Sequence, residues 1–107
     1  MVVPRDFTFS NYADEEGNPR GGKVEGKGID VRWQDGPVRE AGTNGAQVEQ
    51  LIQACILRLE YYQTAADGKF NCFENAMALT KLNEALAWLD RRTALRKERG
   101  VEGTNTA

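Results

Sequence analysis

The chain has 107 residues, a common size for one domain, and we expect a single domain over 1–107. Against 14 Lys and Arg residues stand 16 Asp and Glu residues, and the resulting net charge of −2 disfavours non-specific binding to DNA. No apolar run approaches the roughly 18 residues of a membrane span, and the first residues lack the apolar stretch of a signal peptide, so we expect a cytoplasmic protein with no membrane partner.

Residues 1–42 are rich in glycine and charge, and short alternating patterns within them predict strands. Phe7-Thr8-Phe9 alternates apolar and polar side chains, as a half-buried strand does. The alternation over residues 29–33 is the clearest strand pattern in the chain. With residues 23–25 as a middle strand, this segment predicts a small antiparallel sheet.

Glycine and proline predict where these strands are interrupted. Residues 14–22 contain Asn18-Pro19 and Gly21-Gly22, which predicts a turn or loop over the whole stretch. Gly26-Lys27-Gly28 is too short for a phosphate-binding loop and predicts a strand kink or bulge. Asp35-Gly36-Pro37 ends the last strand.

Helical periodicity begins after Gly45 and predicts a first helix over 44–63. Asn44 is a suitable N-cap, and Gln47 three residues later completes a capping box. A short connection with a glycine follows at residues 65–69. The expected apolar face consists of Val48, Leu51, Ile52, Cys55, Leu59 and Tyr62.

A second helix is predicted over 71–99, with Asn71 as its N-cap and Glu74 in a capping-box position. Gly100 supplies a left-handed stop, and a polar tail occupies 100–107. The predicted fold class is therefore α+β. It consists of a small N-terminal antiparallel sheet followed by a two-helix antiparallel hairpin.

Three stripes run along the second helix, and they predict an oligomer. The first is a leucine seam with coiled-coil-like spacing, and the second is made of small residues. Two such faces need two neighbours. One neighbour is the first helix and the other is expected to be a second copy of the protein, so we expect at least a homodimer. The seam contains Leu79, Leu82, Leu86 and Leu89; the small-residue stripe contains Ala76, Thr80, Asn83, Ala87 and Ala94; and the third stripe contains Trp88, Arg92, Arg96 and Arg99.

Little in the sequence favours catalysis. The chain has no histidine, which removes the commonest general base and the commonest metal ligand. Cys55 and Cys72 have no CxxC partners and are expected to be free thiols that behave as small hydrophobes. No nucleotide-binding or hydrolase motif occurs. We therefore expect no catalytic residues, no metal site and no cofactor.

Five basic residues at the end of the second helix predict an anion site. One or two cations are explained by the negative end of the helix dipole, but five are not. Arginine in particular binds phosphate in a bidentate manner and stacks on bases. The cluster consists of Arg91, Arg92, Arg96, Lys97 and Arg99.

Aromatic residues near the helix connection allow two interpretations. They can stack on a nucleobase, or they can pack the end of the hairpin. Asn83, within the small-residue stripe, likewise either faces solvent or hydrogen-bonds a ligand, because a buried amide without partners is costly. The aromatic residues are Tyr61, Tyr62, Phe70 and Phe73.

The run from Glu74 to Leu89, followed by Arg91-Arg92-Thr93 and by the segment from Arg99 to Thr104, resembles the C-terminal hairpin of the phage Thoeris anti-defence sponges of the first type. The resemblance extends to residues 28–36 and 44–63, and so to most of 23–105. The anti-CBASS sponges share only a shorter segment around residues 78–82.

The resemblance implies a protein that binds cyclic ADP-ribose-type immune signals, such as glycocyclic ADP-ribose, without cleaving them. It would act in the cytoplasm of the infected bacterial host. Some relatives also bind cyclic dinucleotides and trinucleotides, and the family forms homodimers and hexamers. The residues that match the signal pocket are Phe73 and Asn83, and Arg58 and Arg99 are the nearest matches to arginines that hold cyclic dinucleotides in relatives. Arg96 and Thr104 are further candidate ligand-binding residues.

Two other functions remain open at this point. The leucine seam would suit a helical protein-interaction module, such as a phage regulator. A nucleotide-hydrolysing enzyme is the third reading. Recovery of intact signal after incubation separates a sponge from an enzyme, and absence of retention leaves the interaction module.

Overall fold

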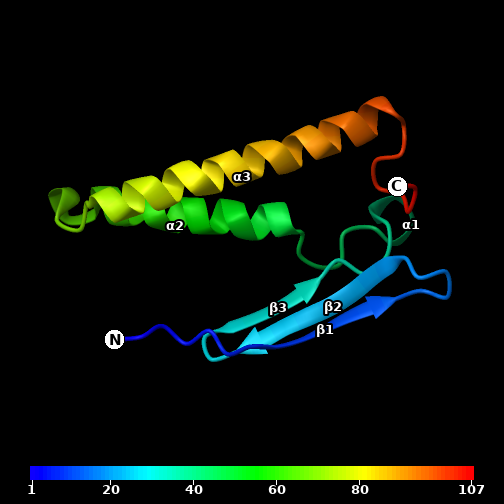
Figure 1. The fold of residues 1–107 in the computed structure, drawn as a ribbon, viewed down its shortest axis with the longest axis horizontal. Helices are drawn as coiled ribbons and strands as arrows, with labels where there is room; N and C mark the ends of the chain where they lie inside the picture. The colour runs from blue at the N-terminus through cyan, green and yellow to red at the C-terminus, as the bar shows by residue number, and fades with distance from the viewer. The chain divides into compact units, whose positions relative to one another are not determined.

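The structure is a computed structural model that describes residues 1–107 (Figure 1). Three strands come first, then a four-residue helix, then two long helices. The chain forms two compact units, which we describe separately: a sheet unit of residues 1–47 and 101–107, and a hairpin unit of residues 48–100. The predicted α+β class is confirmed, while the single domain stays a prediction.

The sheet unit contains one antiparallel sheet in the order β1-β2-β3. Its strands are β1 (Thr8–Ala13), β2 (Pro19–Gly26) and β3 (Ile29–Trp33). Phe9 pairs with Val24, and Val24 pairs with Val31, so one row of apolar side chains crosses one face. Val31 is buried at the end of this row. The alternation predicted for β3 and the middle strand are confirmed. A strand also forms where Phe7-Thr8-Phe9 predicted one, but Phe7 lies outside β1 and Phe9 is exposed, so the predicted half-buried alternation is wrong there.

The predicted loop over residues 14–22 is wrong in its second half. The turn covers only Asp14–Asn18, and the Asp14 carboxylate closes it by accepting hydrogen bonds from the N–H groups of Glu16 and Asn18, both at 2.9 Å. Gly21 and Gly22 lie inside β2 and are buried. A Cβ at Gly22 would collide with the Ser10 carbonyl oxygen, so this glycine permits close strand approach and does not form a turn.

Gly26-Lys27-Gly28 forms the turn between β2 and β3, and not the kink or bulge predicted from the sequence. Gly28 has φ +86°, which glycine adopts without strain. The Phe7 ring occupies the place where a Gly26 side chain would project. The glycines therefore close the hairpin and accommodate an aromatic ring.

Asn44 does not cap a helix, contrary to the prediction. Its side chain accepts from the Asp35 N–H and donates to the Asp35 carbonyl, both at 2.8 Å. Its own N–H donates to Gln34 Oε1 at 2.9 Å. These bonds tie the loop back to the end of β3, and the following helix starts four residues later, at Val48.

A short helix, α1 (Val38–Ala41), follows Pro37 and was not expected from the sequence. The Arg39 N–H donates to the Gly103 carbonyl at 3.1 Å. This bond explains why the C-terminal tail belongs to the sheet unit.

An ion pair joins β2 to the loop after β3. The Arg20 guanidinium donates to both Asp35 carboxylate oxygens, at 3.0 and 3.2 Å. The Gly21 N–H adds a third bond to this carboxylate. Arg20, and then the Gly21 N–H, hold the pKa of the Asp35 carboxyl below its ordinary value.

The hairpin unit consists of α2 (Val48–Gly68) and α3 (Phe73–Glu98), which lie side by side (Figure 1). Ile56, at 3 % exposure, is the one buried residue of these two helices and was missing from the predicted face. Val48, Cys55 and Tyr62 were predicted on that face but are exposed. The half-buried residues of the contact are Leu51, Ile52 and Leu59 of α2 with Leu79, Leu82, Leu86 and Leu89 of α3.

The connection between the helices is closed by a side chain that the sequence did not indicate. Gln63 donates to the Cys72 carbonyl at 3.1 Å and accepts from the Cys72 N–H at 3.0 Å. The Asn71 amide donates to the Gln63 carbonyl, so Asn71 is not the N-cap. Cys72 is the N-cap, and its Sγ accepts from the Asn75 N–H.

Gly100, with φ +75°, ends the last helix as predicted. Neither long helix has a stretch apolar enough to cross a membrane. Only Val31 and Ile56 are buried apolar residues in the whole chain, and α3 has no buried residue. Most of the surface of α3 is therefore open for other contacts.

The Arg20–Asp35 pair predicts a specific dependence of stability on pH. Because the pKa of folded Asp35 is lowered, the pair stabilises the protein above the unfolded-state pKa, and this contribution is lost as the pH falls. We expect Asp35→Asn to lower the urea midpoint at pH 7, and the gap to the parent protein to narrow as the pH falls below the ordinary carboxyl value of 3.8. The Asp14 carboxylate, whose pKa is also lowered, is present in both proteins. Its titration changes both urea midpoints equally and does not affect the gap between them. A gap that stays constant as the pH falls would contradict the assignment.

Candidate functional site

The side of α3 that faces away from α2 carries the residues of the predicted site. The leucine seam is used for the contact with α2, whereas the whole small-residue stripe is exposed. Thr80 Oγ1 and Asn83 Nδ2 each donate to a carbonyl one turn earlier in the same helix, at 3.0 and 2.9 Å. The small-residue stripe, which the sequence predicted as a second contact face of this helix, is therefore exposed to solvent in a single chain.

Phe73 and Asn83 are both exposed, and Phe73 retains 73 % of its accessible surface. Asn83 uses its amide N–H within its own helix, while its Oδ1 makes no bond in the chain. Ten positions along one helix separate them by about 15 Å along the axis and about 80° around it. One straight helix therefore does not bring the two side chains to a single compact ligand.

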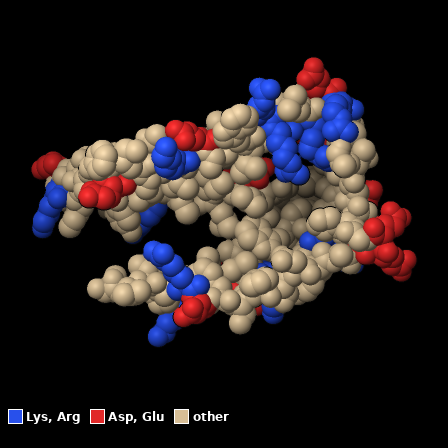
Figure 2. Space-filling model, viewed as in Figure 1, with Lys and Arg blue, Asp and Glu red and all other residues tan.

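Basic side chains gather over the C-terminal end of α3 (Figure 2). Arg96 and Lys97 lie in its last turn, and Arg99 is the C-cap residue. Arg96 is half-buried, whereas Arg99 is exposed. The cations stand where the helix dipole is negative, and arginine is a residue type that binds anionic groups.

The other two predicted ligand-binding residues lie elsewhere. Thr104 belongs to the sheet unit, where its hydroxyl donates to the Val101 carbonyl and accepts from the Thr106 N–H. Arg58 lies on α2, with its guanidinium 5.4 Å from the Tyr61 ring centroid and 4.9 Å from that of Tyr62. Within the hairpin unit, Arg58 therefore lies on a different helix from Arg96 and Arg99, and Thr104 belongs to the other unit.

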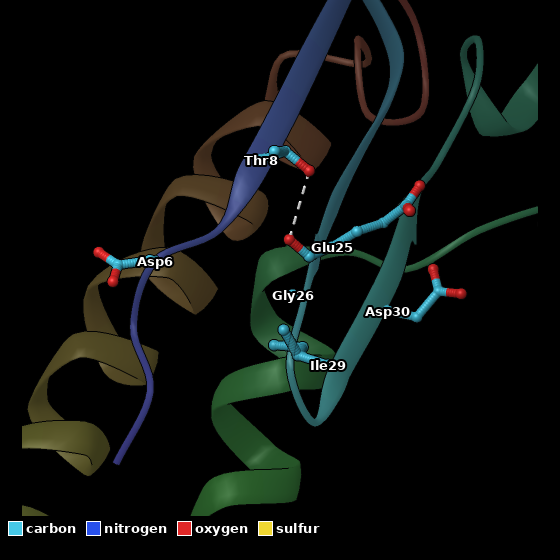
Figure 3. Close-up of a pocket in the computed structure, with 6 residues that line it drawn as sticks. All are labelled: Asp6, Thr8, Glu25, Gly26, Ile29 and Asp30. Atoms are coloured by element: carbon cyan, nitrogen blue, oxygen red, sulfur yellow. Dashed lines mark hydrogen bonds between the residues drawn. The ribbon is translucent and has the colours of Figure 1, made fainter. Parts of the chain in front are cut away.

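A cavity of about 420 Å³ opens beside the β2–β3 turn of the sheet unit (Figure 3). It is lined by Asp6, Thr8, Glu25, Gly26, Ile29 and Asp30. Its three carboxylates do not converge, and Thr8 Oγ1 donates to the Glu25 carbonyl at 3.5 Å (Figure 3). The negative charge around this cavity makes it unsuited to a phosphate-bearing ligand.

A larger groove of about 600 Å³ lies at the helix connection of the hairpin unit. Three of the aromatic residues noted in the sequence contribute to it, but Phe73 does not. Asn75 and two alanines of the turn were not singled out, because the turn geometry that brings them there has no local sequence signal. The lining consists of Tyr61, Tyr62, Ala65, Ala66, Phe70 and Asn75.

An antiparallel sheet followed by an antiparallel helical hairpin, whose second helix is exposed and basic at its C-terminal end, defines the class of fold. The chain belongs to the family described as "Acb2/Tad1, hairpin domain", whose model matches residues 25–94. The match includes β3 and α2 and ends within α3, ahead of Arg96 and Lys97 in its last turn.

A relative named "Thoeris anti-defense 1", from Bacillus phage SBSphiJ7, is similar to this chain. The two are 56 % identical over 80 residues, which make up 75 % of this chain and 54 % of that protein. The chain therefore spans about half the length of this curated relative.

The exposure of Phe73 and Asn83 predicts that neither is needed for folding. We expect Phe73→Ala and Asn83→Ala each to change the free energy of unfolding by at most about 0.5 kcal/mol, as is usual for surface sites. Leu82→Ala, in the half-buried seam, is the matched control and should cost more than about 1 kcal/mol. Urea unfolding at one protein concentration measures all three. A large loss in the first two variants would show that these side chains pack against the protein instead of facing a ligand.

Proposed function

We propose that this protein is a phage anti-defence sponge that sequesters cyclic ADP-ribose-type signals of Thoeris immunity, such as glycocyclic ADP-ribose, in the cytoplasm of the infected host. The observation that carries the proposal is the 56 % identity to a phage protein named for anti-Thoeris defence, over three quarters of this chain. Binding without cleavage is the proposed mechanism. A sponge acts by mass action, so it needs affinity and sufficient copies but no turnover.

The surfaces of α3 support the capture of an anionic, aromatic ligand. Phe73 presents a ring for stacking, and the free Oδ1 of Asn83 is an acceptor for a base or ribose group. In the proposal, Arg58, Arg96, Arg99 and Thr104 contact phosphates, of this signal or of cyclic dinucleotides and trinucleotides. Arginine suits this role because its planar donors match phosphate oxygens.

The distance between Phe73 and Asn83 favours a pocket shared by two protomers. A compact signal cannot span about 15 Å along one helix, whereas two chains can bring Phe73 of one protomer to Asn83 of its partner. The exposed small residues around Asn83 allow close helix approach. We therefore propose at least a homodimer, which can assemble further to a hexamer.

The leucine seam is poorly accessible to a partner protein, which disfavours the alternative of a protein-interaction module that acts through this seam. Leu79, Leu82 and Leu86 are half-buried in the contact with α2, so a partner protein would have to open the hairpin to reach them. This observation favours the sponge.

The proposal predicts stoichiometric retention and intact release of the signal. Glycocyclic ADP-ribose incubated with excess protein should fail to pass a size filter, and heating the complex should return it chemically unchanged in the filtrate. Chromatography against untreated signal measures both steps. Altered signal would show an enzyme, and signal that passes the first filter would reject the sponge.

The shared pocket predicts complementation between two damaged chains. Phe73→Ala and Asn83→Ala homodimers should each lack binding, because each carries two damaged pockets. A mixed dimer carries one pocket with both lesions and one intact pocket. Calorimetry should therefore recover up to half of the wild-type stoichiometry in mixed dimers.

The mixture must first be shown by mass spectrometry to exchange subunits. If exchange occurs and binding does not return, both residues belong to a one-chain site or lie outside the pocket.

A further inference from the structure

An exposed tryptophan and an exposed leucine share one side of α3 near its C-terminal end. Trp88 retains 72 % of its accessible surface and Leu95 retains 47 %. Seven positions place them about 10 Å apart along the axis and within about 20° of each other around it. The leucine seam that contacts α2 lies elsewhere around the helix, so the hairpin contact does not use this pair. Exposed apolar side chains that lie together indicate a contact surface.

Two arginines lie on either side of this apolar pair. Arg91 and Arg92 follow Trp88 by three and four positions, which places them about 60° to one side of it and about 40° to the other. Both are exposed, and neither forms an ion pair with a carboxylate of the chain. Figure 2 shows that further basic side chains gather at the same end of the helix. We call Trp88, Arg91, Arg92 and Leu95 the tryptophan patch.

The carboxylates near the patch leave it positively charged. Glu84 is one turn before Trp88 on the same side of the helix, but it pairs with Lys81 at 3.7 Å. Asp90 lies about 160° around the helix from Trp88. Glu98 lies among the cations of the last turn. The patch therefore combines apolar and positive surface, unlike the acidic cavity beside the β2–β3 turn.

The patch is separate from the surfaces to which the proposed function assigns a role. Asn83 lies about 140° around α3 from Trp88, so a contact between protomers through the small-residue stripe leaves the patch uncovered. Neither of the two cavities described above includes a residue of the patch. Sites for small molecules are concave, whereas a convex helix face can lie flat on a lipid surface.

Each residue type of the patch suits the boundary between lipid headgroups and acyl chains. Tryptophan is enriched at this boundary because its ring is apolar and its N–H is polar. Arginine keeps its stem on apolar surface and extends its guanidinium to phosphate oxygens. Helices that bind membrane surfaces combine such residues and need no apolar span. The expectation of no membrane partner rested on the lack of a spanning segment, so it does not concern surface binding.

We propose that the tryptophan patch binds the surface of anionic lipid bilayers. Trp88 and Leu95 insert among the headgroups, and Arg91 and Arg92 contact the lipid phosphates. Two apolar side chains and two cations give weak, reversible binding, because stable anchoring needs more apolar area. The proposal concerns the hairpin unit and does not rest on the function proposed above.

Sedimentation of the full chain with lipid vesicles tests the proposal. Vesicles of phosphatidylglycerol and phosphatidylcholine in equal amounts should carry the protein into the pellet, whereas vesicles of phosphatidylcholine alone should not. Raising NaCl from about 0.05 M to about 0.5 M should release the protein, because salt screens contacts between exposed charges. Protein that stays in the supernatant with both kinds of vesicle at low salt would overturn the proposal.

Variants locate the contact on the protein. Arg91→Gln with Arg92→Gln should weaken binding to the anionic vesicles at least about tenfold, the loss expected from two cations at a lipid surface. Trp88→Ala should weaken it at least about fivefold, because the indole is the largest apolar group of the patch. The matched control is Lys27→Gln with Arg32→Gln, which removes the same charge from exposed residues of the sheet unit and should change binding little. Equal losses in the two double variants would show attraction to the overall charge and refute the patch.

Fluorescence gives a second measurement of the same contact. In the variant Trp33→Phe, Trp88 is the one remaining tryptophan, and anionic vesicles should move its emission to shorter wavelength as the ring leaves water. If a second copy of the chain covers the patch instead, the emission should shift with protein concentration in the absence of lipid, and vesicles should add no further shift. That result would contradict the proposal. The sedimentation assay uses the unaltered chain, so the proposal stays testable if Trp33→Phe fails to fold.

Discussion

The contact between α2 and α3 is the interaction on which the rest of the hairpin depends. Ile56 is buried in it, and the leucine seam of α3 is half-buried against α2. α3 contributes 26 residues to the hairpin, yet none of them is fully buried. Because one stripe of the helix is sufficient for the contact, the remaining faces carry side chains that folding does not require. Such exposed apolar and basic residues on a small protein indicate surfaces for partners or ligands.

The sheet unit, like the hairpin unit, has very few buried side chains. Val31 is the one buried apolar side chain of this unit and ends the apolar row across the strands, and hydrogen bonds and an ion pair supply the other contacts. Asn44 fastens the loop after β3, and Arg20 with Asp35 joins that loop to β2. Exposed hydrogen bonds and ion pairs contribute little free energy each. A chain with so small a core is the kind that gains stability from association, which agrees with the proposed oligomer.

Periodicity predicted the elements well, because the alternation of β3 and the leucine spacing of α3 are local and are imposed by burial. Helix starts were predicted poorly. Asn44 and Asn71 are both suitable N-caps, but each has partners elsewhere: Asn44 bonds the backbone of Asp35, and Asn71 bonds Gln63. Exposed single residues such as Phe73 could be singled out from the sequence. The groove could not, because Asn75 meets the tyrosines only through the left-handed turn at Ala66 and Asp67.

The central claim is that the exposed surface of α3 binds the immune signal. Hydrogen exchange of the full chain, with and without saturating glycocyclic ADP-ribose, tests this claim most directly, because binding slows local opening where the ligand contacts the protein. The account predicts slower exchange in the segments of α3 around Phe73 and Asn83, with no change in the β1–β2 turn at residues 14–18. Unchanged exchange throughout α3, or protection confined to the sheet unit, would contradict it.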